Sequence, residues 1–121
     1  MFHTFEIDIK NGILRESYIG LIDFDVLRDA NTAIISNPEF RKGLNFLTDL
    51  REATIQVGYK EMLIHTSQLP DLGIKKQAFI VDRDLEFGMI RMFETLTNEK
   101  GHYEEVRIFK DIEEGLKWLN S

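Results

Sequence analysis

Oppositely charged residues follow two of the apolar segments that the sequence predicts as strands. The third expected strand finishes Asp49-Leu50-Arg51, and the fourth finishes Asp82-Arg83-Asp84. In open α/β sheets, ligands bind outside the carboxyl ends of the strands. We therefore predict a surface for a partner or a polar ligand, formed by Asp49, Arg51, Asp82 and Arg83. The alternative is that each aspartate caps a helix or pairs with the neighbouring arginine, because structural ion pairs resemble sites.

The residue types that catalysis or metal binding needs form no pattern in this chain. Zinc requires three or four ligands, usually delivered in close pairs, and the spacings around His3, His65 and His102 offer none. We expect these histidines to be surface residues. No serine stands in a G-x-S-x-G turn, and the glycines are scattered singly rather than forming a phosphate loop. The sequence therefore predicts a protein without catalytic residues, metal or cofactor.

A stripe of methionine and aromatic residues suggests a second kind of site. Its members, which could line a pocket for a small apolar ligand, are Phe87, Met89, Met92 and Phe93. The alternative is plain core, because methionine fills irregular gaps between packed layers.

Length and composition limit the classes of protein to which the chain can belong. Its 121 residues, without a linker or an internal repeat, predict one domain over residues 1–121. The net charge of −6 argues against binding to nucleic acid. No apolar run approaches the roughly 18 to 20 residues that span a bilayer, so we expect no stable membrane insertion. The absence of cysteine fits the cytoplasm.

Hydrophobic periodicity predicts the elements that carry these residues. Alternation over residues 4–9 and the turn dipeptide Asn11-Gly12 predict an antiparallel hairpin whose return strand is Ile13 to Leu21. Further strands are expected at Leu44–Thr48, Ala78–Val81 and Val106–Ile108. Because helices alternate with these later strands, the pattern predicts a mixed sheet that is mainly parallel after the hairpin.

Four helices are expected around this sheet. The first starts at Phe24, capped by Asp23 or Asp25, and three more cover Thr54–Leu69, Leu85–Leu96 and the segment after Asp111. Gly88 lies inside the third of these helices. Since glycine is unfavourable there, we expect it to allow a close approach to a neighbouring element, so that Gly88→Leu would destabilise the fold.

Several of these segments together resemble the SpoIIAA-like group of STAS domains. The resemblance rests on the strand Ala78–Asp82, on Phe87–Glu94 with its F-G-x-x-R-M-aromatic pattern, and on Phe109–Leu119 with its Trp-Leu ending. The opening hairpin, the first helix and Asp49-Leu50-Arg51 also fit, so that the likeness covers nearly the whole chain.

This resemblance implies a bacterial α/β domain with a mixed sheet flanked by helices, acting as a non-catalytic regulatory or protein-interaction module. Typical members carry a phosphorylatable serine in an Asp-x-Ser motif, and Arg51 stands at that position here. Thr54 is the nearest hydroxyl, and we predict that it is not a phosphosite. The wider group is also similar to CRAL-TRIO lipid-binding domains, which keeps a carrier or sensor of an apolar ligand as the alternative. The protein partner is unknown, and a homodimer is one assembly that the sequence allows.

Overall fold

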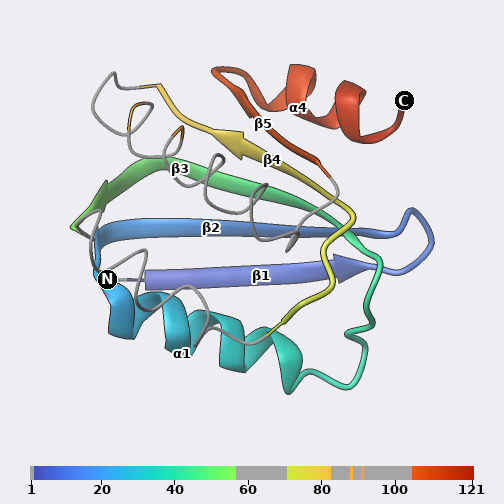
Figure 1. The fold of residues 1–121 in the computed structure, drawn as a ribbon, viewed down its shortest axis with the longest axis horizontal. Coiled ribbons are helices and arrows are strands. Elements are labelled where there is room, and N and C mark those ends of the chain that lie inside the picture. Colours follow the sequence, from blue (N-terminus) through green and yellow to red (C-terminus); the bar gives the residue numbers. More distant parts are fainter. Residues whose placement is uncertain (1, 57–70, 83–87, 89–90, 92–104) are drawn as a thin grey trace.

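The structure is a computed structural model that describes residues 2–56, 71–82, 88, 91 and 105–121 (Figure 1). Its first two strands are joined by a tight turn. Strand β1 spans Phe2–Asp8 and pairs antiparallel with β2, Ile13–Ile22. Gly12 in the turn has a φ of 67°, a conformation that glycine adopts without strain. The predicted hairpin at Asn11-Gly12 is therefore confirmed.

Three parallel strands complete a five-stranded sheet with the order β1-β2-β3-β4-β5. They are β3 at Asn45–Ile55, β4 at Lys76–Ile80 and β5 at Glu105–Phe109, and β3 is parallel to β2. The predicted mixed sheet, with an antiparallel hairpin followed by parallel strands, is confirmed.

The structure describes two complete helices, one on each face of the sheet. Helix α1, Phe24–Ile35, begins at Asp23, whose carboxylate accepts a hydrogen bond from the Val26 amide at 2.9 Å. Its buried Ala30 and Ile34 pack on what we call the inner face. Helix α4, Ile112–Leu119, packs on the opposite, outer face over β3, β4 and β5. Neither of these two helices covers the outer face of β1 and β2.

The predicted helix Thr54–Leu69 needs correction at its start. Thr54 and Ile55 belong to β3 and Gln56 is not helical, because β3 continues beside β2 to Ile22 and buries Ala53. Residues 57–69 lie outside the described residues, as does most of Leu85–Leu96. Of the about four helices expected, two are complete in the part of the chain that is described.

The expectation for Gly88 is wrong. Gly88 is helical and exposed, and a Cβ atom placed on it would have no heavy atom within 4 Å. The glycine that does allow close approach is Gly115 in α4. A Cβ atom there would lie 2.9 Å from Cδ1 of Ile80 and 3.2 Å from Cδ1 of Leu47. The backbone of α4 is thus packed directly against the side chains of the sheet.

Candidate interaction surface

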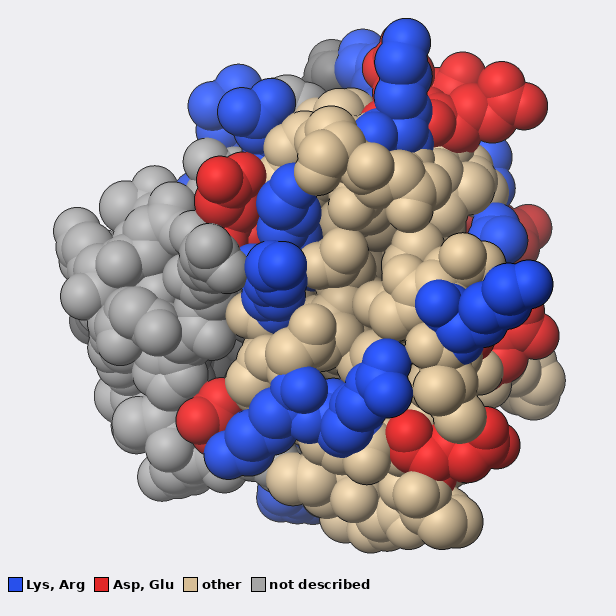
Figure 2. Space-filling model, turned by 90° about the vertical axis from the view of Figure 1, so that its right-hand side faces the viewer, with Lys and Arg blue, Asp and Glu red and all other residues tan. Residues whose placement is uncertain are grey.

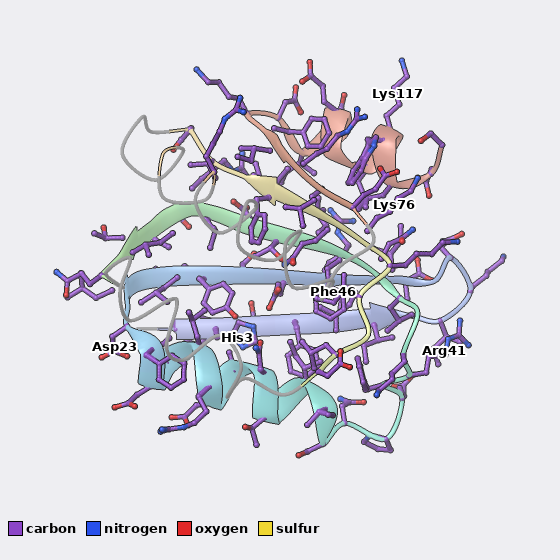
Figure 3. The ribbon with its side chains drawn as sticks, in the orientation of Figure 1. His3, Asp23, Arg41, Phe46, Lys76 and Lys117 are labelled. Atoms are coloured by element: carbon purple, nitrogen blue, oxygen red, sulfur yellow. The ribbon has the colours of Figure 1, made fainter. Side chains whose placement is uncertain are left out.

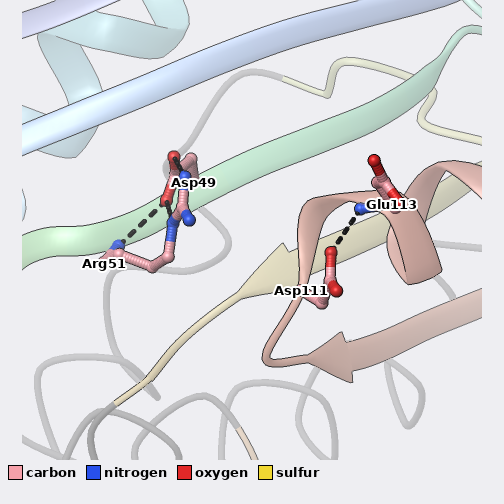
Figure 4. A network of polar contacts seen from close by, with 4 residues as sticks. All are labelled: Asp49, Arg51, Asp111 and Glu113. Carbon is pink, nitrogen blue, oxygen red and sulfur yellow. Dashed lines mark hydrogen bonds and ion pairs between the residues drawn. The ribbon is translucent and has the colours of Figure 1, made fainter.

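Asp49 and Arg51 form an ion pair within β3 (Figure 4). The guanidinium donates from Nε to Oδ1 of Asp49 at 3.0 Å and from Nη2 to Oδ2 at 2.9 Å, so the pair is bidentate. Alternation along β3 places both side chains on the outer face with Leu47. The sequence placed them at the end of the strand, but β3 continues to Ile55. They therefore lie on the face of the sheet.

This contact controls the titration of Asp49. Partial burial raises the pKa of Asp49, but the hydrogen bonds and positive charge of Arg51 outweigh burial and leave the pKa below its ordinary value. The shift stabilises the fold above the unfolded pKa of roughly 4, and this stability is lost as the pH falls through the folded pKa. We predict that Arg51→Gln moves the NMR titration midpoint of Asp49 upward. An unchanged midpoint would show that Arg51 does not cause the shift.

Asp82 lies just beyond β4, whose Ile80 is level with Asp49 on β3. Hydrogen bonding and charge from Asp49 raise the pKa of Arg51, and the charges of Asp82 and Glu52 contribute in the same direction. The topology therefore brings Asp49, Arg51 and Asp82 to one part of the sheet. Arg83, the fourth member of the predicted set, lies outside the described residues.

A groove of about 260 Å³ opens on the outer face beside Asp49. Its residues come from β1, β2, β3 and the first position of α4: Thr4, Phe5, Glu6, Arg15, Glu16, Ser17, Leu47, Asp49 and Ile112. Arg15 and Glu6 are Cα partners on neighbouring strands, so the groove presents both signs of charge. Its volume is below the roughly 300–1,000 Å³ of typical small-molecule pockets.

Large apolar side chains are exposed on the same face. Phe2 is 59% exposed, Leu21 54% and Ile19 42%. Phe2 and Ile19 are Cα partners on β1 and β2, and Ile19 and Leu21 are two residues apart on one strand. Alternation along both strands directs all three away from α1. They form a contiguous apolar patch, which we call the outer apolar patch.

A buried chain of polar side chains crosses the inner face and was missed by the sequence analysis. His3 Nε2 lies 2.8 Å from Oε1 of Glu16, and the Thr48 hydroxyl donates to Oε2 of Glu16 at 2.7 Å. Gln77 then donates from Nε2 to Oγ1 of Thr48 at 2.9 Å. The four residues come from four adjacent strands, and Figure 3 shows His3 at the β1–β2 pair on the side of α1.

The expectation that His3 is a surface residue is therefore wrong. Its side chain is 7% exposed and that of Glu16 is 4% exposed, and His3 also packs 4.4 Å from the ring of Tyr18. Both carboxylate oxygens of Glu16 are occupied by neighbouring side chains. This arrangement joins the strands and presents no reactive group to the groove. His65 and His102 lie outside the described residues.

Lysine and arginine side chains gather at the end of the molecule that carries the hairpin turn (Figure 2). Arg41 there donates to the carbonyl of Ile9 at 3.2 Å, and Lys42 lies 3.9 Å from the carboxylate of Asp71. Lys76 donates to the Ser121 carbonyl at 3.3 Å and lies over the ring of Trp118. These contacts connect the hairpin turn and the loop that follows α1 to neighbouring segments, and they connect β4 to the C-terminus.

The described residues contain no group of three histidine or acidic side chains arranged to hold a metal ion. None of the helices that they form is long and apolar enough to cross a membrane. The predicted apolar pocket at Phe87, Met89, Met92 and Phe93 lies outside the described residues.

The fold is similar to that of a solved structure. It is an uncharacterized protein of the DUF3478 family with a SpoIIAA-like fold, from Shewanella loihica PV-4. The match has a TM-score of 0.63 and 14% sequence identity, and covers 98% of this chain and 92% of the other. No family model and no curated protein matches the sequence. The chain therefore has a SpoIIAA-like fold, as its sequence resemblance predicted.

Proposed function

We propose that this chain is a non-enzymatic regulatory module that binds a protein partner through the outer face of β1, β2 and β3. We call this the open outer face, and its contact residues are the outer apolar patch together with Thr4, Glu6, Asp8, Arg15, Ser17, Asp49, Arg51 and Glu52. The observation that carries the proposal is the outer apolar patch itself. Three large apolar side chains stand exposed together on a face that no helix covers within the described part of the chain.

Exposed apolar surface of this kind has a physical cost. Each side chain left in water forgoes roughly 1.5–3 kcal/mol that burial would provide. Contiguous apolar patches rimmed by polar residues mark sites of interaction in soluble proteins. Here the patch adjoins charged side chains and a groove, which gives an apolar centre with a polar border.

Two further observations support an interaction module over the alternatives. The groove is small for an apolar ligand of lipid size, which favours partner side chains over a carried molecule. The buried His3–Glu16 pair lies on the inner face with its carboxylate fully engaged, so it offers no general base to the groove. The SpoIIAA-like fold agrees with a regulatory role.

Site-specific photo-crosslinking tests the proposal. A photoreactive amino acid is placed at Ile19 on the open outer face and, as a matched control, at Ile35 on α1, which is similarly exposed. Each variant is irradiated in lysate of its source and in purified form, and the products are identified by mass spectrometry. We expect a defined protein adduct from position 19 and none from position 35. Equal labelling from both positions, or none from either, would refute a dedicated interaction face.

A further inference from the structure

We propose that the partner bound at the open outer face is a second copy of this chain, in a dimer with two-fold symmetry. This inference rests on the proposed function and names its partner. In a two-fold interface the same patch meets itself, so the patch must be complementary to its own surface. The open outer face can be complementary to itself because it carries the outer apolar patch and side chains of both charges.

The charges of this face are of both signs. Arg15 and Arg51 are the cations, and the carboxylates are Glu6, Asp49, Glu52 and, at the end of β1, Asp8. A two-fold rotation about an axis that lies in the plane of the interface turns a second copy to face the first and can place arginines against carboxylates. Since the outer apolar patch involves β1 and β2, the two patches can also meet at the centre of the same interface.

The remainder of the protein explains why self-association would use this face. The whole chain carries a net charge of −6, so two copies repel each other on average. Two arginines and four carboxylates give the open outer face a formal charge of −2. Contact there brings little like charge together and buries the outer apolar patch.

The area of the open outer face indicates how tightly two copies can bind. β2 has 10 residues, which corresponds to about 33 Å, and three strands span roughly 14 Å. The projected face is thus roughly 450 Å² per copy, below the roughly 800 Å² of standard interfaces. We accordingly expect a weak dimer, with a dissociation constant of about 10 μM to 1 mM.

Sedimentation equilibrium over a range of protein concentrations measures this dimer directly. Leu21→Glu places a charge in the outer apolar patch and is expected to weaken dimerisation by about tenfold or more. Ile35→Glu makes the same change on α1, at a similarly exposed isoleucine, and is expected to leave the dissociation constant unchanged. Circular dichroism checks that both variants fold. Equal weakening by both variants would overturn the assignment.

Complementary charge variants test whether the face meets itself. Arg15→Glu removes one of the two cations of the open outer face, and Glu6→Lys removes one of its carboxylates. Each variant alone therefore loses part of the attraction between arginines of one copy and carboxylates of the other, and is expected to dimerise more weakly than wild type. An equal mixture of the two is expected to form the mixed dimer, seen by native mass spectrometry. A mixture that associates no better than the separate variants would place the interface elsewhere.

Failure of the dimer can be distinguished from failure of the proposed function. If the wild-type protein is monomeric up to millimolar concentration and position 19 crosslinks a different protein, the second copy is wrong and the interaction module stands. If position 19 crosslinks nothing and the protein is monomeric, both are wrong.

Discussion

His3→Leu is expected to lower the free energy of unfolding by about 3 kcal/mol, because it leaves the buried Glu16 carboxyl group without the hydrogen bond to the His3 ring. Glu16 lies on the inner face and would keep its hydrogen bond from the hydroxyl of Thr48. Leucine has a volume similar to histidine, so lost packing contributes little. Urea denaturation followed by circular dichroism measures the effect.

The double variant separates the pair from its surroundings. Replacing both His3 and Glu16 with leucine removes the buried carboxyl group together with its hydrogen-bond partner, and much of the lost stability is expected to return. The more exposed Asp49–Arg51 pair is the matched control, since Arg51→Leu should change stability by no more than about 1 kcal/mol. Strictly additive losses from the two single variants would show that His3 and Glu16 do not act as a pair.

The sheet could be predicted because its signals are local. The Asn11-Gly12 turn fixes the hairpin, and Asp23 begins α1 through its own side chain. The length of β3 was not predictable in this way. Its pairing with β2 shifts register between Ser17 and Ile19, so the apolar alternation is interrupted after Leu50. The polar residues Arg51 and Glu52 then read as the end of a strand.

The buried hydrogen-bonded chain of polar residues could be predicted only in part from the sequence. Its members are His3, Glu16, Thr48 and Gln77. The hairpin register pairs His3 with Tyr18 and Phe5 with Glu16, which makes His3 and Glu16 diagonal neighbours on one face. Glu16 also alternates in phase with Leu14 and Tyr18, which indicates burial. The contacts to Thr48 and Gln77 depend on parallel pairing across long connections, and no local pattern fixes that register.

The exposure of the outer apolar patch was also not predictable from the local sequence pattern. Ile19 and Leu21 alternate with Tyr18 and Ile22 along β2, so both faces of this strand carry large apolar side chains. Such a strand reads as one covered on both sides. Only the packing shows that α4 lies over β3, β4 and β5 and leaves Ile19 and Leu21 exposed.

Gly115→Leu is expected to lower the free energy of unfolding by about 2 kcal/mol through overpacking. A Cβ atom alone would already lie 2.9 Å from Ile80 and 3.2 Å from Leu47, so a full leucine side chain must displace α4 from the sheet. The gain in helix propensity from glycine to leucine, roughly 1 kcal/mol at most, opposes this cost without cancelling it.

The same substitution at Gly88 is the matched control and should have the opposite sign. Gly88 is helical and exposed with open space around its Cα, so leucine there adds helix propensity without a clash. We expect Gly88→Leu to raise the free energy of unfolding by up to about 1 kcal/mol. Denaturant titrations of both variants against wild type measure the difference. A Gly115→Leu protein as stable as wild type would show that α4 does not depend on close contact of its backbone with β3 and β4.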